Sequence, residues 1–138
     1  MHLETQWVVG FVDGEGCFHV SVNKHASMVL GYQVLPEFTV VQHERDVKLL
    51  HGLKDYFDCG VVRKNNGNCM AYRVRSLDHL SNKIIPFFEK HPLKTVKNIE
   101  FHKFKRVVLL MERGAHLDSS GLDEIRGIVA KMNRKSAV

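Results

Sequence analysis

Apolar residues recur along the chain with two spacings, and the change from one spacing to the other separates helices from strands. Near the amino end, apolar residues within positions 3–13 predict a short helix. Every second residue is apolar over residues 18–22 and again within residues 33–42, so we predict two β-strands joined by a loop at residues 24–32. Pro36 interrupts the second strand, where we expect a bulge or a position without a ladder hydrogen bond.

The rest of the chain repeats this arrangement. The turn sequence KNNGN at residues 64–68 lies between two further short strands. Ser76 is a typical cap for a short helix after them, and we expect Pro86 and Pro92 to break the region that follows into short pieces. Helical spacing of apolar residues predicts three longer helices, which cover residues 44–57, residues 95–113, and a last segment that opens at Asp118 or Ser119.

This order, α-β-β-α-β-β-α-α, predicts an α+β fold in a single domain over residues 1–138. The two hairpins form one antiparallel four-stranded sheet, and the helices cover one of its faces. A chain of 138 residues that is 44% hydrophobic is long enough to bury a core. No apolar run approaches the roughly 20 residues that span a bilayer, and the amino end does not resemble a signal peptide, so we expect an intracellular protein with no membrane partner.

Polar residues occupy the strand positions that alternate with the core. A solvated sheet face is the ordinary explanation for such a pattern. The formal net charge of +5 and the excess of arginine over carboxylate on this face favour a polyanionic partner instead, because amides and guanidinium groups bind base edges and phosphates. Both explanations apply to Ser21, Asn23, Gln33, Glu37, Thr39, Arg63, Asn65, Arg73 and Arg75.

The three cysteines, Cys17, Cys59 and Cys69, are odd in number and none lies in a CxxC pair. We expect reduced thiols on strands. Together with His51, the last two could in principle hold a metal, but their spacing fits no zinc template.

The stretch VVGFVDGEG at residues 8–16 combines two unusual features. Gly10 and Gly14 are four residues apart, share one helix face, and would let another backbone approach closely. Asp13 and Glu15 lie at the carboxyl end of the predicted helix, where the helix dipole disfavours negative charge. This placement favours a counter-charge such as a divalent metal, and an exposed turn with two acids is the alternative.

This nonapeptide resembles the LAGLIDADG motif of a family of homing endonucleases. Glu15 takes the eighth place, where the family has Asp or Glu. The segments PLKTVKN at 92–98 and LDSSGLDEIRGIVAKMN at 117–133 also look like family segments. The residues that fall in register with the motif are Gly10, Asp13, Gly14 and Gly16.

The resemblance implies a homodimer, because family members with one motif pair their motif helices across a two-fold axis. It also implies a Mg²⁺ site in which Glu15 and the main-chain carbonyl of Gly14 hold the metal against a scissile phosphate. The metal would activate water, so no side chain need be a nucleophile. The dimer interface implied by the motif consists of Val9, Gly10, Asp13 and Gly14.

Two further catalytic positions follow from matching the family pattern. Gln42 ends the second strand just before a helix, like a family residue that positions solvent. Lys97 matches a family active-site lysine, and it also falls in line with the apolar stripe that contains Phe101 and Phe104. Lys94, one turn earlier, is the competing candidate.

The resemblance therefore implies an intron-encoded, Mg²⁺-dependent, site-specific endonuclease for double-stranded DNA, with a long pseudo-palindromic target. The two hairpins would form a saddle in the major groove, which assigns the polar sheet face to DNA contact. We expect it in an organelle, either chloroplast or mitochondrion, or in a bacterial cytoplasm. Alternatives are a maturase that binds intron RNA, a DNA-binding regulator without cleavage, and a dimerisation module with incidental basic charge. The presence of Glu15 favours the nuclease.

Overall fold

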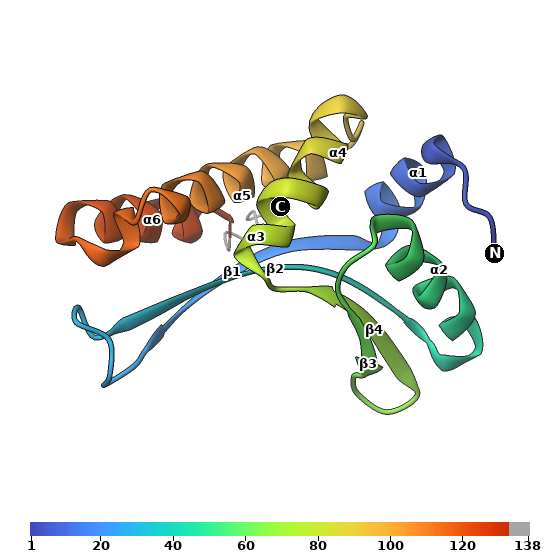
Figure 1. The fold of residues 1–138 in the computed structure, drawn as a ribbon, viewed down its shortest axis with the longest axis horizontal. Coiled ribbons are helices and arrows are strands. Elements are labelled where there is room, and N and C mark those ends of the chain that lie inside the picture. Colours follow the sequence, from blue (N-terminus) through green and yellow to red (C-terminus); the bar gives the residue numbers. More distant parts are fainter. Residues whose placement is uncertain (133–138) are drawn as a thin grey trace.

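A four-stranded antiparallel sheet, covered by helices on one face, forms the molecule in the computed structural model, which describes residues 1–132 (Figure 1). This confirms the predicted α+β fold. The strand order is β1-β2-β4-β3. The strands are β1 (Gly16–Lys24), β2 (Tyr32–His43), β3 (Val61–Lys64) and β4 (Cys69–Val74).

The long hairpin of β1 and β2 runs without interruption. Its pairs extend from Gly16 opposite Val40 to Lys24 opposite Tyr32, so the bulge expected at Pro36 is not formed. Strand β4 pairs with β2 only from Phe38 onward, which leaves Pro36 beyond the end of β4. The strand accommodates this proline because one of its two edges lies outside the β4 ladder there.

The helices follow the predicted order with shifted boundaries. Helix α1 (Thr5–Glu15) ends two residues later than predicted, so Asp13 and Glu15 lie within its last turn. The predicted helix over residues 44–57 is a short 3₁₀ turn, η1 (Glu44–Asp46), followed by α2 (Val47–Phe57). The remaining helical elements are α5 (Lys97–Glu112), the turn η3 (Ala115–Leu117) and α6 (Ser119–Met132).

One continuous helical segment lies between the second hairpin and α5. Ser76 caps it as predicted, because its hydroxyl accepts a hydrogen bond from the His79 N–H. The break predicted at Pro86 is wrong: α3 (Leu77–His79), the π-helical turn η2 (Leu80–Ile84) and α4 (Ile85–Lys90) follow one another directly. The wider turn before Pro86 accommodates a residue that has no N–H for the usual helical bond.

The core lies between the sheet and the helices, and aromatic rings fill its centre. Phe18 is 5% exposed, and its ring centroid lies between 5.1 and 5.6 Å from those of Phe38, Phe88, Phe101 and Phe104. These rings come from two strands and two helices, so one cluster joins the layers. No helix among residues 1–132 is long and apolar enough to cross a membrane.

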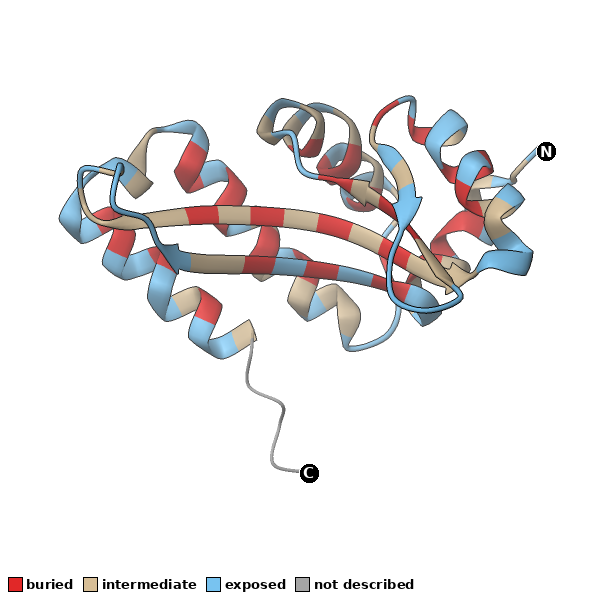
Figure 2. Cartoon of the chain, turned by 90° about the horizontal axis from the view of Figure 1, so that it is seen from below, coloured by how far each residue is buried: buried red, intermediate tan, exposed pale blue. Residues whose placement is uncertain are grey.

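No helix in the described part of the chain covers the opposite face of the sheet. Buried and accessible residues alternate along β1 and β2 when the sheet is viewed from that side (Figure 2). The sheet is curved, and this outer face is its concave side (Figure 1). Cys17 and Cys69 lie on strands as expected, but Cys59 precedes β3; all three thiols are free.

Replacing Phe18 tests the aromatic cluster. We expect Phe18→Ala to lower the free energy of unfolding by about 3–5 kcal/mol, because it leaves a cavity among four rings. Urea titration followed by circular dichroism measures this change. Val29→Ala is the control, because Val29 is 95% exposed and its truncation should change stability by less than about 0.5 kcal/mol.

Candidate functional site

The last turn of α1 is joined to the loop before α5 by the carboxylate of Asp13. This carboxylate accepts a hydrogen bond from the Lys94 N–H at 2.7 Å, one from the Thr95 N–H at 3.2 Å, and one from the Thr95 hydroxyl. The Thr95 hydroxyl also accepts from the Lys97 N–H at 3.2 Å. The start of α5 is thereby fixed against the end of α1.

The Asp13 carboxylate is held in its charged form. Partial burial opposes the charge, but the hydrogen bonds from the Thr95 hydroxyl and the two backbone N–H groups, with the nearby Lys97, lower its pKa below the ordinary value of 3.8. The negative charge of Asp13 is therefore satisfied by hydrogen bonds within its own chain.

Lys97 is the first residue of α5 and reaches back to α1. Its Nζ donates to the Val12 carbonyl oxygen at 3.1 Å, an oxygen that also accepts a hydrogen bond from the Gly16 N–H at the end of that helix. Burial lowers the pKa of Lys97, while Cys17, Asp13 and Glu15 act in the opposite direction. The competing Lys94 is exposed and contributes its backbone N–H to the Asp13 contact. Of the two lysines, the structure therefore places the Lys97 ammonium beside α1.

Gly14 and Glu15 complete the end of α1. Both are exposed, so the Glu15 carboxylate and the backbone at Gly14 face outward beside Lys97. The carbonyls of a last helical turn have no partners within the helix and can bind a cation. This end of α1 thus presents a carboxylate, free backbone oxygens and an ammonium group together.

Gln42 lies near this end of α1, at the end of β2. Gly16, which directly follows α1, pairs with Val40, and Gln42 lies two residues further along β2. Its side chain faces the same way as Val40, and its amide donates to the Val41 carbonyl oxygen at 2.9 Å. The structure therefore brings Gln42 to the same end of the sheet as Glu15, with its amide turned toward its own backbone.

The donor set suits Mg²⁺ shared with other ligands. Within residues 1–132, no three His, Cys, Asp or Glu side chains gather closely enough to hold a metal by themselves. Mg²⁺ usually keeps several waters and takes one or two carboxylates together with substrate phosphates. Glu15 and the Gly14 carbonyl fit that kind of site, in which a phosphate and solvent supply the remaining oxygens.

A second surface of α1 is open and apolar. An added Cβ at Gly10 or Gly14 would meet nothing within 4 Å. Trp7 is 46% exposed and stacks on Phe11, with ring centroids 5.0 Å apart. Gly10, Gly14 and these two rings share a helix face because they are three, four and seven residues apart. We call Trp7, Gly10, Phe11 and Gly14 the α1 open face.

Val9 does not belong to this face. It is 3% exposed and packs in the core of its own chain, so it offers no surface to a partner. The implied dimer contact through Val9 is therefore corrected. Asp13 is also engaged within its own chain, through Lys94 and Thr95.

The nine polar candidates occupy the outer face of the sheet or its continuation. Seven lie on strands at positions that alternate with core residues, and Asn65 and Arg75 directly follow β3 and β4. Thr39 is partly engaged, because its hydroxyl donates to the Tyr72 carbonyl oxygen at 3.1 Å. The structure thus gathers all nine on the concave side: Ser21, Asn23, Gln33, Glu37, Thr39, Arg63, Asn65, Arg73 and Arg75.

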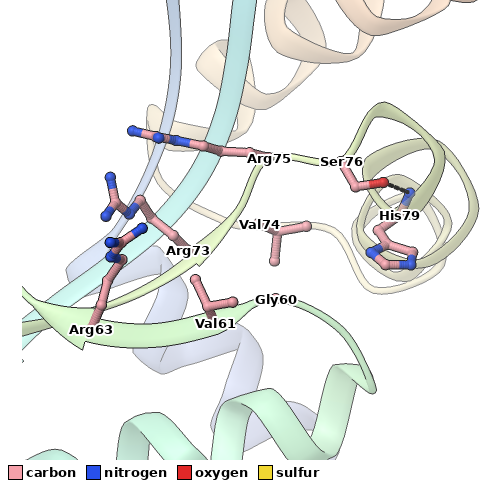
Figure 3. A pocket seen from close by; sticks show the side chains of 8 residues that line it. All are labelled: Gly60, Val61, Arg63, Arg73, Val74, Arg75, Ser76 and His79. Atoms are coloured by element: carbon pink, nitrogen blue, oxygen red, sulfur yellow. Dashed lines mark hydrogen bonds between the residues drawn. The ribbon is translucent and has the colours of Figure 1, made fainter.

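Arginines are concentrated at the β3–β4 end of this face. A hollow of about 270 Å³ lies there, and the side chains of Arg63, Arg73 and Arg75 line it (Figure 3). Arg75 Nε donates to Glu37 Oε1 at 2.8 Å, and Arg73 Nη1 lies 3.7 Å from the same oxygen. Arg73 Nε is buried and has no hydrogen-bond partner among residues 1–132. This part of the face attracts anions.

Sequence reasoning missed Thr95, Trp7 and Phe11. Thr95 lies in the segment PLKTVKN, and its spacing of two residues before Lys97 was the available signal. Trp7 and Phe11 are four residues apart on the helix that carries the two glycines, a spacing that places them on one face. Their exposure could be known only from the packing of α1.

Comparison with known proteins identifies the family. The profile of the LAGLIDADG endonuclease family matches residues 8–108. A probable intron-encoded endonuclease of Neurospora crassa is 36% identical over 130 residues, which are 92% of this chain and 24% of that protein. The chain thus spans about a quarter of the length of this relative. It belongs to the LAGLIDADG endonuclease family.

Solved structures agree with this assignment. The homing endonuclease I-TnaI is 52% identical with a TM-score of 0.93, and the match covers 99% of this chain and 92% of that one. The LAGLIDADG homing endonuclease I-SmaMI bound to cleaved DNA is 34% identical with a TM-score of 0.92. That match covers 95% of this chain and 44% of the I-SmaMI chain.

Removing the Asp13 charge tests the joint between α1 and α5. We expect Asp13→Asn to lower the free energy of unfolding by about 1–3 kcal/mol at neutral pH, because charge-assisted hydrogen bonds are lost. The pKa of Asp13 is lower in the folded state, so its contribution is complete above the ordinary value of 3.8 and disappears as the pH falls through the folded pKa.

Urea titrations of both proteins from pH 7 to pH 2 measure this difference. The stability difference between the wild type and Asp13→Asn should shrink steadily below about pH 4. Asp55→Asn, which removes an exposed carboxylate on α2, is the control and should show a small difference at every pH. A constant difference for Asp13→Asn would contradict the assignment.

Proposed function

We propose that this protein is a site-specific endonuclease for double-stranded DNA that acts as a homodimer and requires Mg²⁺. The observation that carries the proposal is the placement of Glu15 and Lys97 together at the open end of α1, next to a glycine-lined helix face. A concave sheet face with three arginines accompanies this site.

The dimer is proposed from the α1 open face. Two such helices can approach backbone to backbone, because no atom of residues 1–132 fills the space at Gly10 and Gly14. Burying Trp7 and Phe11 in the contact would remove exposed aromatic surface from water, which favours association. A two-fold axis beside this face would bring the two Glu15 carboxylates near each other.

Each residue of the site has a distinct task in this mechanism. Glu15 and the Gly14 carbonyl would hold Mg²⁺, and the bound ion would supply activation of water and charge stabilisation at the leaving 3′ oxygen. Lys97 keeps two N–H bonds free beyond its contact with Val12, and its ammonium can stabilise negative charge on the scissile phosphate. The Gln42 amide, at the same end, can orient solvent after a rotation from its contact with Val41.

DNA recognition is assigned to the outer sheet face. Strands can lie in the major groove as a ribbon, where amide and guanidinium groups read base edges. The curvature of the sheet lets the face follow a convex duplex (Figure 1). A two-fold dimer predicts a pseudo-palindromic target, with one half-site for each subunit.

The biological setting is proposed from the relatives. The Neurospora crassa relative is described as intron-encoded, and a Schizosaccharomyces pombe relative carries the name Cox1-I1b. We propose that this chain is also encoded by an intron and acts in an organelle. Assistance to splicing through intron RNA is the alternative activity that the following experiment can favour.

Removing the Glu15 carboxylate tests the nuclease. We expect the wild type to cut a randomised duplex library in the presence of Mg²⁺ at a pseudo-palindromic site, and Glu15→Gln to make no cuts. The variant should still bind the selected site, because the sheet carries recognition. Sequencing of the cut ends and an electrophoretic binding assay give the two readouts.

Glu4→Gln is the matched control for this experiment. It removes an exposed carboxylate from the other end of the same helix, where the Glu4 side chain makes no capping hydrogen bond, and it should leave cleavage unchanged. Equal loss of cleavage and binding in Glu15→Gln would contradict the division of tasks. A folded wild type that cuts nothing would overturn the nuclease and favour binding to intron RNA.

Filling the glycine face tests the dimer. We expect Gly10→Ala and Gly14→Ala to shift the protein from dimer to monomer in sedimentation velocity, because each added methyl group separates two closely packed backbones. The methyl group meets no atom of residues 1–132 within 4 Å, and alanine favours a helix over glycine by about 1 kcal/mol. The variants should therefore remain folded.

Gly127→Ala in α6 is the matched control. An added Cβ there also meets nothing within 4 Å, so it should raise helix stability similarly and leave the association constant unchanged. If the two α1 variants remained dimeric with the same association constant as the wild type, the proposed helix contact would be wrong.

A further inference from the structure

Glu37 places a negative charge on the face proposed for DNA, and two arginines converge on it. It stands opposite His19 on β1, and both Glu37 and Arg75 lie one residue beyond the last β2–β4 pair, Phe38–Val74. Arg75 Nε donates to Glu37 Oε1 at 2.8 Å. Arg73 Nη1, at 3.7 Å from the same oxygen, is within ion-pair distance but not within hydrogen-bond distance.

Neither stability nor DNA affinity accounts for a carboxylate at this place. An ion pair at a partly exposed site contributes between zero and about 1 kcal/mol to folding. A negative charge on the outer face also repels phosphate, so it weakens nonspecific binding to DNA. The remaining consequence of Glu37 is geometric, because its bond to Nε fixes the plane of the Arg75 guanidinium group.

The hydrogen bond to Glu37 leaves the two terminal nitrogens of the Arg75 guanidinium group free. Its side chain is 56% exposed, and the bond to Glu37 uses Nε, so both terminal nitrogens remain available. Figure 3 shows the Arg75 side chain extending across the neighbouring strands. Guanine presents two acceptors, O6 and N7, in the major groove, and the two terminal nitrogens of a guanidinium group match them.

We propose that Glu37 is a positioning residue for sequence recognition, which holds Arg75 so that its terminal nitrogens read a guanine. Without the carboxylate, the long side chain of Arg75 can turn to a backbone phosphate, a contact that carries no sequence information. This inference rests on the proposed function as a DNA endonuclease. It replaces the expectation that Glu37 itself contacts a base.

Arg73 differs from Arg75 in ways that set the two roles apart. The Arg73 side chain is 22% exposed, and its Nε is buried without a partner among residues 1–132. The Arg73 nitrogen lies 3.7 Å from Glu37 Oε1, whereas the Arg75 nitrogen lies 2.8 Å from it. Glu37 therefore constrains Arg75 through a charge-assisted hydrogen bond, whereas it attracts Arg73 electrostatically without a hydrogen bond.

The test compares binding to the preferred site with binding to sites that carry one replaced base pair. We expect Glu37→Gln, whose neutral amide oxygen holds Arg75 less strongly than the carboxylate does, to reduce discrimination at one guanine position by about tenfold, within the range that a bidentate contact supplies. The variant should at the same time bind all duplexes more tightly, with a steeper dependence on salt, because Arg75 reaches a phosphate and a negative charge is gone.

A double-mutant cycle separates positioning from direct reading. In an Arg75→Ala background, Glu37→Gln should cause no further loss of discrimination at that base pair. Glu112→Gln, which removes an exposed carboxylate from α5 above the other face of the sheet, is the matched control and should leave discrimination unchanged.

Three results would overturn the inference. Undiminished discrimination in Glu37→Gln, whether or not binding to all sites becomes tighter, would show that Glu37 does not position Arg75 for sequence recognition. A loss that persists in the Arg75→Ala background would show that Glu37 contacts the base itself. A wild type that binds every duplex equally would overturn the proposed function as well, which distinguishes the two failures.

Discussion

The hydrogen bonds from residues 94–95 to Asp13 are the contact on which the site depends. They are made by a charged acceptor, so they are stronger than neutral ones, and they join two segments that are 81 and 82 residues apart in the chain. The same contact sets the start of α5. Lys97, the first residue of that helix, can therefore reach the Val12 carbonyl oxygen and lie beside Glu15.

The aromatic cluster and the outer face are two consequences of one sheet geometry. Alternate residues of a strand point to opposite sides of the sheet. When one residue packs against α4 and α5 in the core, the next residue along the strand therefore lies on the concave side. Helices on one face supply rigidity, and the other face stays accessible for recognition. The site at the end of α1 lies next to β1, which begins at Gly16. The same strand therefore positions both the proposed catalytic residues and part of the proposed DNA-binding face.

Local patterns predicted most of the fold, because strand alternation and helical spacing are visible without neighbours. These local patterns gave wrong predictions where tertiary packing overrides the conformational preference of a single residue. The predicted break at Pro86 is instead a widened helical turn. Helix α1 continues through Asp13 and Glu15 although it contains two glycines, Gly10 and Gly14. The motif places Val9 on a partner surface, whereas the packing of α1 buries Val9 in the core of its own chain.

The sequence by itself determined the motif, the order of the elements and the alternation that separates core from outer face, because these depend on residue types at fixed spacings. Only the tertiary structure decided which lysine lies beside Glu15, that Thr95 completes the Asp13 contact, and that Arg75 is held by Glu37. These contacts join residues that are distant in the chain. Their geometry is set by sheet register and helix packing, which no local pattern encodes.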